Sequence, residues 1–458
     1  MSSKNLLRRA LLFGFIALGI VHNAYGQSWT TQYDRGRTVY GIKAVDQNTV
    51  WAGARSSAFF RTIDGGTTWV DNIVPGSGGA SFFAVAPFDQ NTAYLAGTDP
   101  NGGDGRLYKT ADGGQTWTLQ YRLTKPGVFF NGIAFWDKDN GIAFSDPVDG
   151  SFLIVTTSNG GATWQEVPKA NIPAPLPGEF GSWAGSSSIA VEGSNNAWFG
   201  TTFARPVRVF RTRNKGRTWT VANTPLSTNG NAWGIGTLAF IDSLNGYAGG
   251  SGSTNPTNNL VRTTDGGKTW SLVTTYKQQA PNALAYIPQM GHLGLVVNAV
   301  DGSFYTQDGG ATWKRISSDL YADLTFVSPT VGWTTGFTSG PFPTSIIAKF
   351  NGNLSTAVTD RKSDVPQAFE LAQNYPNPFN PETRIKFQVP TTSWVQLEVF
   401  NLSGQHIATL LEGKRPAGEH ELSWDGRNDF GQPAPSGIYM LVIRAGKFTQ
   451  TKKMVLMR

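Results

Sequence analysis

The chain has 458 residues with 54 glycines, 15 tryptophans and no cysteine, which is enough sequence for two or more cores and excludes a disulfide framework. Its formal net charge of +7 is small for this length, and the basic residues form no long block, so the charge gives no argument for nucleic-acid binding. After residue 26 no long segment shows the 3.6-residue period of a helix, and the composition therefore predicts an all-β protein.

The first 26 residues have the pattern of a secretory signal peptide. Lys4, Arg8 and Arg9 precede an apolar run over residues 10–21, and small residues at 24 and 26 offer a cleavage site. This run is too short to span a bilayer, although a retained anchor is the alternative. Removing the three cations lowers the net charge to +4, and we expect no transmembrane segment after cleavage.

From residue 62 onward, a phrase of eight residues that begins with Thr and ends with Thr-Trp recurs six times, and its acidic or amide residues lie 43 to 55 positions apart. Asp or Asn followed by glycine suits a hairpin turn, because the side chain accepts backbone N–H groups and glycine adopts positive φ without strain. The closing Trp can fill the wedge between neighbouring sheets. We predict structural roles in a propeller for Asp64, Asp112, Asn159, Asn214, Asp265 and Asp308, and for Trp69, Trp117, Trp164, Trp219, Trp270 and Trp313.

The repeated phrase resembles the Asp-box repeat of the sialidase-like and photosystem-assembly-factor-like propellers. The resemblance covers residues 28 to about 350 and implies an architecture, but no photosynthetic role follows from it. Sialidases place Phe-Arg-Ile-Pro before the first Asp box, whereas the residues from Ala58 to Arg61 read Ala-Phe-Phe-Arg. We therefore do not expect sialidase activity.

A second repeated strand, made of small and aromatic residues, gives the number of blades. It occurs seven times, first at Val50–Gly53 and last at Val331–Gly336, but the seventh copy is not followed by Thr-Trp. The segment Ser28–Gln32 reads like the missing outer strand. We predict a seven-bladed propeller over residues 27–352, closed by its N-terminal strand.

Ligand sites of such a propeller are expected on the rim opposite the Asp boxes, where loops follow the second strand and the Trp strand. The candidate ligand-binding residues there are Asp146, Asp149, Trp183, Arg205 and Arg208. For Asp146 and Asp149 the alternative is a turn-forming role beside Pro147 and Gly150. Two functions remain open: a binding scaffold for a glycan or protein, which we favour, and a glycosidase that uses two rim carboxylates. The sequence assigns no catalytic residue, cofactor or metal ligand.

After a predicted linker at 353–368, alternating strands from residue 383 to 456 predict a small immunoglobulin-like β-sandwich over 369–458. This segment resembles the type A C-terminal sorting domain of the type nine secretion system. The residues that carry the resemblance include Pro376, Asn377, Pro378, Gly437, Tyr439 and Lys453. It implies that the secretion machinery is a partner, and that the protein passes through the periplasm to the outer surface of a Gram-negative bacterium or into the medium. The alternative is a binding module with no sorting role.

Overall fold

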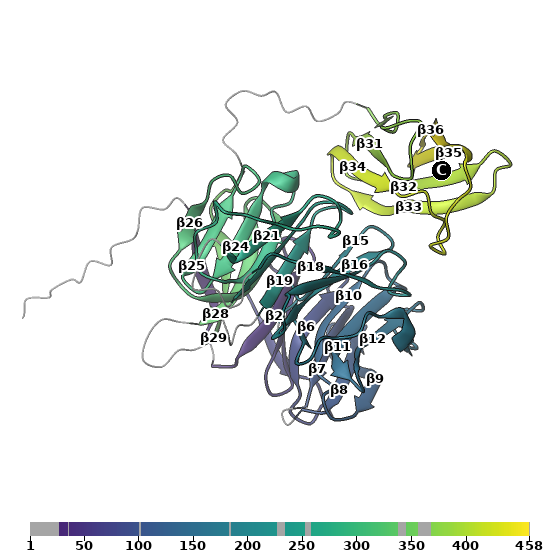
Figure 1. The fold of residues 1–458 in the computed structure, drawn as a ribbon. Coiled ribbons are helices and arrows are strands. Elements are labelled where there is room, and N and C mark those ends of the chain that lie inside the picture. Colours follow the sequence, from purple (N-terminus) through teal and green to yellow (C-terminus); the bar gives the residue numbers. More distant parts are fainter. Residues whose placement is uncertain are drawn as a thin grey trace, which may run out of the picture.

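The computed structural model describes residues 27–34, 36–99, 102–182, 185–226, 234–251, 258–337, 345–355 and 368–457. Within these residues the chain forms a β-propeller and a smaller β-sandwich, with no α-helix and two short 3-10 turns, η1 (Lys169–Asn171) and η3 (Gly291–Leu293) (Figure 1). This confirms the predicted all-β fold, and no helix in the described part is long and apolar enough to cross a membrane. The predicted signal peptide and most of the predicted linker lie outside the described residues.

Each blade is an antiparallel sheet whose strands follow one another from the innermost outward. Blades 1 to 3 are β2 (Val39–Ala44), β3 (Val50–Ala54), β4 (Ala58–Thr62) and β5 (Val70–Ile73); β6 (Ser81–Pro87), β7 (Ala93–Thr98), β8 (Asp104–Thr110) and β9 (Thr118–Thr124); and β10 (Phe130–Phe135), β11 (Gly141–Val148), β12 (Ser151–Thr157) and β13 (Gln165–Glu166). Blade 4 has a divided inner strand, β14 (Phe180–Gly181) and β15 (Ile189–Glu192), followed by β16 (Asn196–Thr202), β17 (Arg208–Thr212) and β18 (Thr220–Asn223).

The remaining blades complete the ring. Blades 5 and 6 are β19 (Gly234–Phe240), β20 (Gly246–Ser251), β21 (Leu260–Thr263) and β22 (Ser271–Leu272), and β23 (Pro281–Tyr286), β24 (Leu295–Ala299), β25 (Gly302–Thr306) and β26 (Lys314–Ser317). Blade 7 is β27 (Tyr321–Ser328), β28 (Val331–Phe337), β29 (Ser345–Asn351) and, as its outermost strand, β1 (Ser28–Asp34).

The N-terminal strand closes the ring, as predicted. Strand β1 pairs antiparallel with β29 along its whole length, from Ser28 opposite Asn351 to Asp34 opposite Ile346. Trp29 packs among Tyr321, Phe326 and Phe350, with ring centroids 5.5 to 5.8 Å apart. Trp29 therefore takes the place of the tryptophan that the seventh repeat lacks.

The core of the propeller lies between blades rather than within them. Trp164 of blade 3 clusters with Tyr94 of blade 2, and Trp270 of blade 5 clusters with Trp198 of blade 4. Because each blade buries its apolar face only against its neighbours, no blade is expected to be stable by itself. This explains why a large aromatic residue recurs at the same position of every repeat.

The sandwich consists of two facing sheets. One contains β30 (Glu370–Leu371), β31 (Thr383–Val389) and β34 (Gly418–Trp424), and the other contains β33 (His406–Arg415), β32 (Ser393–Asn401), β35 (Gly437–Ala445) and β36 (Phe448–Leu456). Tyr439 is buried beside Trp424. The segment before β31 is fastened to β36, because Asn377 Nδ2 donates to the Lys453 carbonyl (3.1 Å) and Asn377 Oδ1 accepts from the Val455 amide (2.8 Å).

Candidate functional site

The Asp boxes are hairpin turns between the third and fourth strands of the blades. In the first box, the Thr62 hydroxyl accepts from the Gly66 amide (2.9 Å) and donates to Asp64 Oδ1 (2.8 Å). The Asp64 carboxylate also accepts from the Thr68 amide (2.9 Å) and hydroxyl (2.6 Å). These bonds, above all the one from the Thr68 hydroxyl, lower the pKa of Asp64 to about 2. Its carboxylate is thus engaged in the turn itself, and glycines at 65 and 66 adopt positive φ.

The two boxes with asparagine keep the same geometry by reversing one hydrogen bond. Asn159 Oδ1 accepts from the Thr163 amide (3.0 Å), while Asn159 Nδ2 donates to the Thr163 hydroxyl (2.9 Å). Asn214 makes the same two bonds to Thr218. Because a hydroxyl both donates and accepts, the hairpin tolerates either an acid or an amide.

On the opposite rim, blades 2, 3 and 4 border a hollow of about 680 Å³ whose lining includes Lys125, Phe129, Asp146 and Phe180. Asp146 Oδ1 accepts from Asn131 Nδ2 (2.8 Å) and from the Gly181 amide (2.9 Å). Burial raises the pKa of Asp146 to about 6, and these two bonds offset only part of that effect. Asp146 Oδ2 has no hydrogen-bond partner among the described residues. The hollow therefore contains a carboxyl group whose pKa burial holds above that of a free aspartate.

A β-bulge turns Asp146 toward this hollow. The β11–β12 register shifts between Ser145 and Pro147, which leaves Asp146 without an opposite residue. Of the seven described pairings between second and third strands, this is the only one that carries a shift. Asn131 occupies the bulge of the neighbouring inner strand β10. Two bulges thus bring Asn131 and Asp146 together, and bulges commonly redirect side chains at functional sites.

The other predicted rim residues are placed differently. Asp149 forms the two-residue turn between β11 and β12 and pairs with Lys125 (3.0 Å), so its role is the turn. Arg208 is buried and paired with Glu179, with Nε 2.9 Å from Oε1, which makes it a structural cation rather than a ligand-binding one. Arg205 is exposed in the loop before β17, and Trp183 lies outside the described residues.

Among the described residues, no three or more His, Cys, Asp or Glu side chains lie together as a group that could hold a metal ion. Asp104, on the predicted rim, is paired with Arg106 and with Arg122 (2.8 Å). The Arg122 side chain is the main cause that lowers the pKa of Asp104, and a carboxylate satisfied by two guanidinium groups is a poor ligand for a cation.

The sequence did not reveal a segment that closes the central channel. Between β14 and β15, the Ser186 amide and the Ser187 hydroxyl donate to the Asp323 carboxylate of blade 7 (2.8 and 3.1 Å), which also accepts from the Ile42 amide of blade 1 (3.0 Å). Ser188 donates to the Asn131 carbonyl of blade 3 (2.7 Å). We call residues 182 and 185–188 the channel segment, since it joins inner strands across the ring.

Next to the channel segment lies a cavity of about 340 Å³ lined by residues of the inner strands. Lys43 lines this cavity, and its side chain is exposed on the cavity side. Because the ring of blades surrounds the side chain, burial lowers the pKa of its ammonium group. The cavity and the rim hollow share no lining residue.

Comparison with known proteins agrees with this architecture. Residues 261–272 and 304–315 match the BNR/Asp-box repeat, and residues 375–447 match the FlgD Ig-like domain. In structure, the chain is similar to YCF48 from Cyanidioschyzon merolae (16% identity, TM-score 0.52, 71% of this chain and 99% of that one). It is also similar to the GH74 xyloglucanase from Xanthomonas campestris (14% identity, TM-score 0.51, 84% of this chain and 60% of that one). These likenesses show the fold.

In overall sequence, the chain is similar to a curated xyloglucanase of a Paenibacillus species. The two are 25% identical over 256 residues, which is 48% of this chain. The chain spans about a quarter (24%) of that relative's length. The protein is thus a β-propeller, two repeats of which match the BNR/Asp-box repeat, followed by a β-sandwich that includes the match to the FlgD Ig-like domain.

Proposed function

We propose that this chain is an exported binding protein that holds a glycan in the rim hollow of its propeller. The observation that carries the proposal is the bulge in β11, which turns Asp146 into a hollow lined by Phe129 and Phe180. A bulge found in one blade of seven serves that blade's own site rather than the shared fold.

The hollow and its surroundings have the chemistry of a sugar site. Phe180 and Phe203 keep 45% and 48% of their surface exposed and meet edge to face with centroids 5.8 Å apart. Exposed aromatic rings offer flat apolar surfaces against which the C–H faces of a sugar can pack, while a carboxylate accepts its hydroxyl groups. We therefore expect a neutral or cationic glycan rather than an acidic one.

The number of carboxyl groups in the hollow favours binding of a glycan over its hydrolysis. Glycoside hydrolysis usually requires two carboxyl groups across the scissile bond. Asp146 is the one carboxylate among the described residues that line the hollow. Asp104, Asp149 and Glu179 are held in ion pairs.

Titration calorimetry with a panel of glycan oligosaccharides tests this proposal, and xyloglucan fragments belong in the panel because the curated relative is named a xyloglucanase. We expect Phe180→Ala and Asp146→Asn each to weaken binding about tenfold or more. Phe430→Ala is the control, since Phe430 is 76% exposed in the sandwich. Equal affinity of all three variants, or no binding across the panel, would contradict a glycan site in this hollow.

A glycosidase is the second candidate, and one observation favours it. A carboxyl group whose burial raises its pKa to about 6 is suited to act as a general acid. Release of reducing sugar from xyloglucan that is lost in Asp146→Asn would support hydrolysis. Sugar release that persists in this variant would count against Asp146 as the acid.

We further propose that the C-terminal domain is a sorting domain of the type nine secretion system, and that the protein reaches the cell surface or the medium through the periplasm. Support comes from the sorting-type residues, two of which, Asn377 and Lys453, meet in the fold. In a host with this system we expect an extracellular product that begins near Gln27 and lacks the domain that starts near Phe369. Intact mass decides this, and an extracellular product that still ends at Arg458 would contradict the sorting role.

A further inference from the structure

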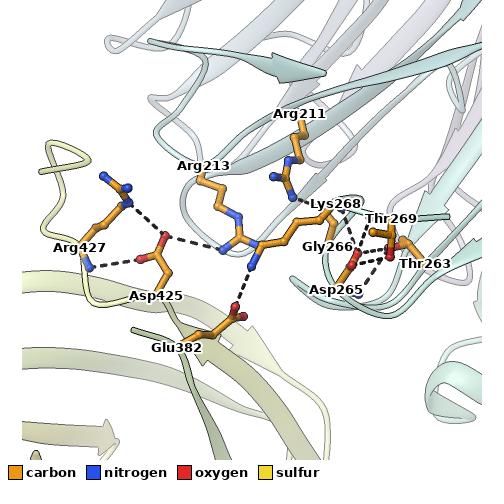
Figure 2. A network of polar contacts seen from close by, with 10 residues as sticks. All are labelled: Arg211, Arg213, Thr263, Asp265, Gly266, Lys268, Thr269, Glu382, Asp425 and Arg427. Carbon is orange, nitrogen blue, oxygen red and sulfur yellow. Dashed lines mark hydrogen bonds and ion pairs between the residues drawn. The ribbon is translucent and has the colours of Figure 1, made fainter. Parts of the chain in front are cut away.

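The sandwich contacts the propeller through polar side chains on the Asp-box face (Figure 2). Lys268 Nζ of the blade 5 box lies 2.6 Å from Glu382 Oε2, and Arg213 of the blade 4 box lies 4.0 Å from Asp425. Figure 1 shows β15 and β16 as the neighbouring strands of the propeller. A third ion pair joins Glu192, at the end of β15, to Arg415 of β33 (3.1 Å).

The sequence concentrates cations at this contact. Each Asp box has two positions, directly before and three residues after its Asp or Asn, whose side chains are free of the bonds to that Asp or Asn side chain, although Thr67 and Gln115 donate to the backbone carbonyl of the Asp. In blades 4 and 5 these four positions hold Arg213, Arg217, Thr264 and Lys268, whereas in the other four boxes they hold Ile63, Thr67, Ala111, Gln115, Ser158, Ala162, Gln307 and Ala311. Cations thus occur in the two boxes that meet the sandwich, and Glu382 and Asp425 face them.

No apolar core joins the two domains. Among the described residues, the sandwich has its own core cluster, and every other cluster contains propeller residues only. The side chains of the three ion pairs keep between 19% and 38% of their surface exposed. Solvent and salt therefore reach the Lys268–Glu382 and Arg213–Asp425 pairs, and exposed pairs of this kind hold two bodies together only weakly. Glu192 is more enclosed, and burial raises the pKa of its carboxyl group.

We infer that the Asp-box hairpins of blades 4 and 5 are an electrostatic latch that docks the chain's own C-terminal domain reversibly. The latch acts near the segment that begins with Tyr375, because Glu382 follows Pro381 directly. If that segment serves in sorting, which rests on the proposed function, the docked state limits access to it and the open state presents it.

Carbodiimide cross-linking of the purified protein with both domains tests the latch, since the reagent joins an amine to a carboxylate in direct contact. We expect a Lys268–Glu382 cross-linked peptide at about 20 mM NaCl whose yield falls about threefold or more at about 500 mM, where charges are screened within a few ångströms. Lys125 and Asp149, 3.0 Å apart within the propeller, are the internal control for the effect of salt on an exposed ion pair that undocking cannot separate, and the Lys268–Glu382 yield should fall by more than theirs.

Charge-reversal variants test whether the ion pairs themselves hold the sandwich against the propeller. Arg213→Glu leaves both cross-linking residues in place and should lower the Lys268–Glu382 yield at low salt, and adding Asp425→Lys should restore it. Arg217→Glu is the matched control, because Arg217 is exposed in the same hairpin and makes no ion pair with the described residues of the sandwich.

A yield insensitive to salt and to Arg213→Glu would mean a permanent contact. A missing cross-link beside a normal control would mean that the domains do not dock. Both results would overturn the latch, and neither bears on export, which is measured in cells.

Discussion

Replacement of Asp323 by alanine tests whether the channel segment holds the ring together. The Asp323 carboxylate accepts from the amides of Ile42 and Ser186 and from the Ser187 hydroxyl, so it ties blade 7 to blade 1 and to the insertion of blade 4. Ile42 is fully buried and Ser186 is 7% exposed. Alanine would leave these two amides without an acceptor at about 1–3 kcal/mol each, and the Leu324 amide, which donates to Asp323 Oδ1 (3.0 Å), would lose that bond as well. Water in the neighbouring cavity can satisfy the Ser187 hydroxyl. We expect a loss of about 3–5 kcal/mol in the free energy of unfolding of the propeller.

Urea unfolding followed by tryptophan fluorescence measures this loss, and the sandwich, with Trp394 and Trp424, offers an internal reference transition. Asp319→Ala is the control, because Asp319 is an exposed acid in the link just before β27, where it accepts hydrogen bonds from Ser317 and Tyr321. The propeller midpoint should fall in Asp323→Ala, and the sandwich midpoint should not. If Asp323→Ala and Asp319→Ala unfold alike, the channel segment contributes nothing to closure.

Three further predictions concern closure, the turns and the rim. Deleting residues 28–32 removes a paired strand and Trp29 and should destabilise the propeller by at least about 4 kcal/mol; an unchanged melting temperature would show that blade 7 is complete without β1. Because the pKa of Asp64 is about 2 when folded and about 3.9 when unfolded, its stabilising effect is present above pH 4 and lost toward pH 2. Asp64→Asn should keep stability at pH 7 and lose less between pH 4 and 2, and acid melts equal to the parent would contradict this. For Asp146 the folded pKa of about 6 lies above the unfolded value of about 3.9, so stability falls as the pH rises from about 4 to about 6 and the full cost is present above pH 6. Asp146→Asn should therefore stabilise the propeller by about 1–3 kcal/mol at pH 7 but not at pH 4, as paired thermal melts can check.

The architecture could be predicted because its signals are local. In the first Asp box, Asp64 and the glycines that follow it form a turn whose hydrogen bonds all lie within eight residues, so the phrase itself specifies the hairpin. The glycines that begin several second strands also have a local reason. Phe135 and Phe240 of the inner strands lie across Gly141 and Gly246, and a Cβ there would come within 2.6 Å of the ring.

The rim could not be predicted in the same way, because its roles depend on contacts between distant segments. Arg208 and Glu179 both appear in rim loops of the sequence, yet they neutralise each other in the interior. Asp146 owes its position to two bulges in neighbouring strands; Pro147 is a local signal for the bulge in β11, but the direction in which Asp146 points depends on the packing of both strands. Asp323 carries no motif at all, and its role follows only from the closure of the ring.

The two faces of the propeller differ in what they contact, and a last prediction follows from this difference. On the Asp-box face, short hairpins use most of their polar groups in their own turns, and the free positions in blades 4 and 5 meet the sandwich. The hollow that contains Asp146 lies on the opposite rim, and it shares no residue with that contact. Opening the latch should therefore leave the hollow unchanged. We expect Arg213→Glu, which weakens docking, to bind the same glycan with the affinity of the parent protein in calorimetry at low salt. A change of about tenfold in that affinity would show that docking and the rim are coupled, and it would place part of the ligand site on the Asp-box face.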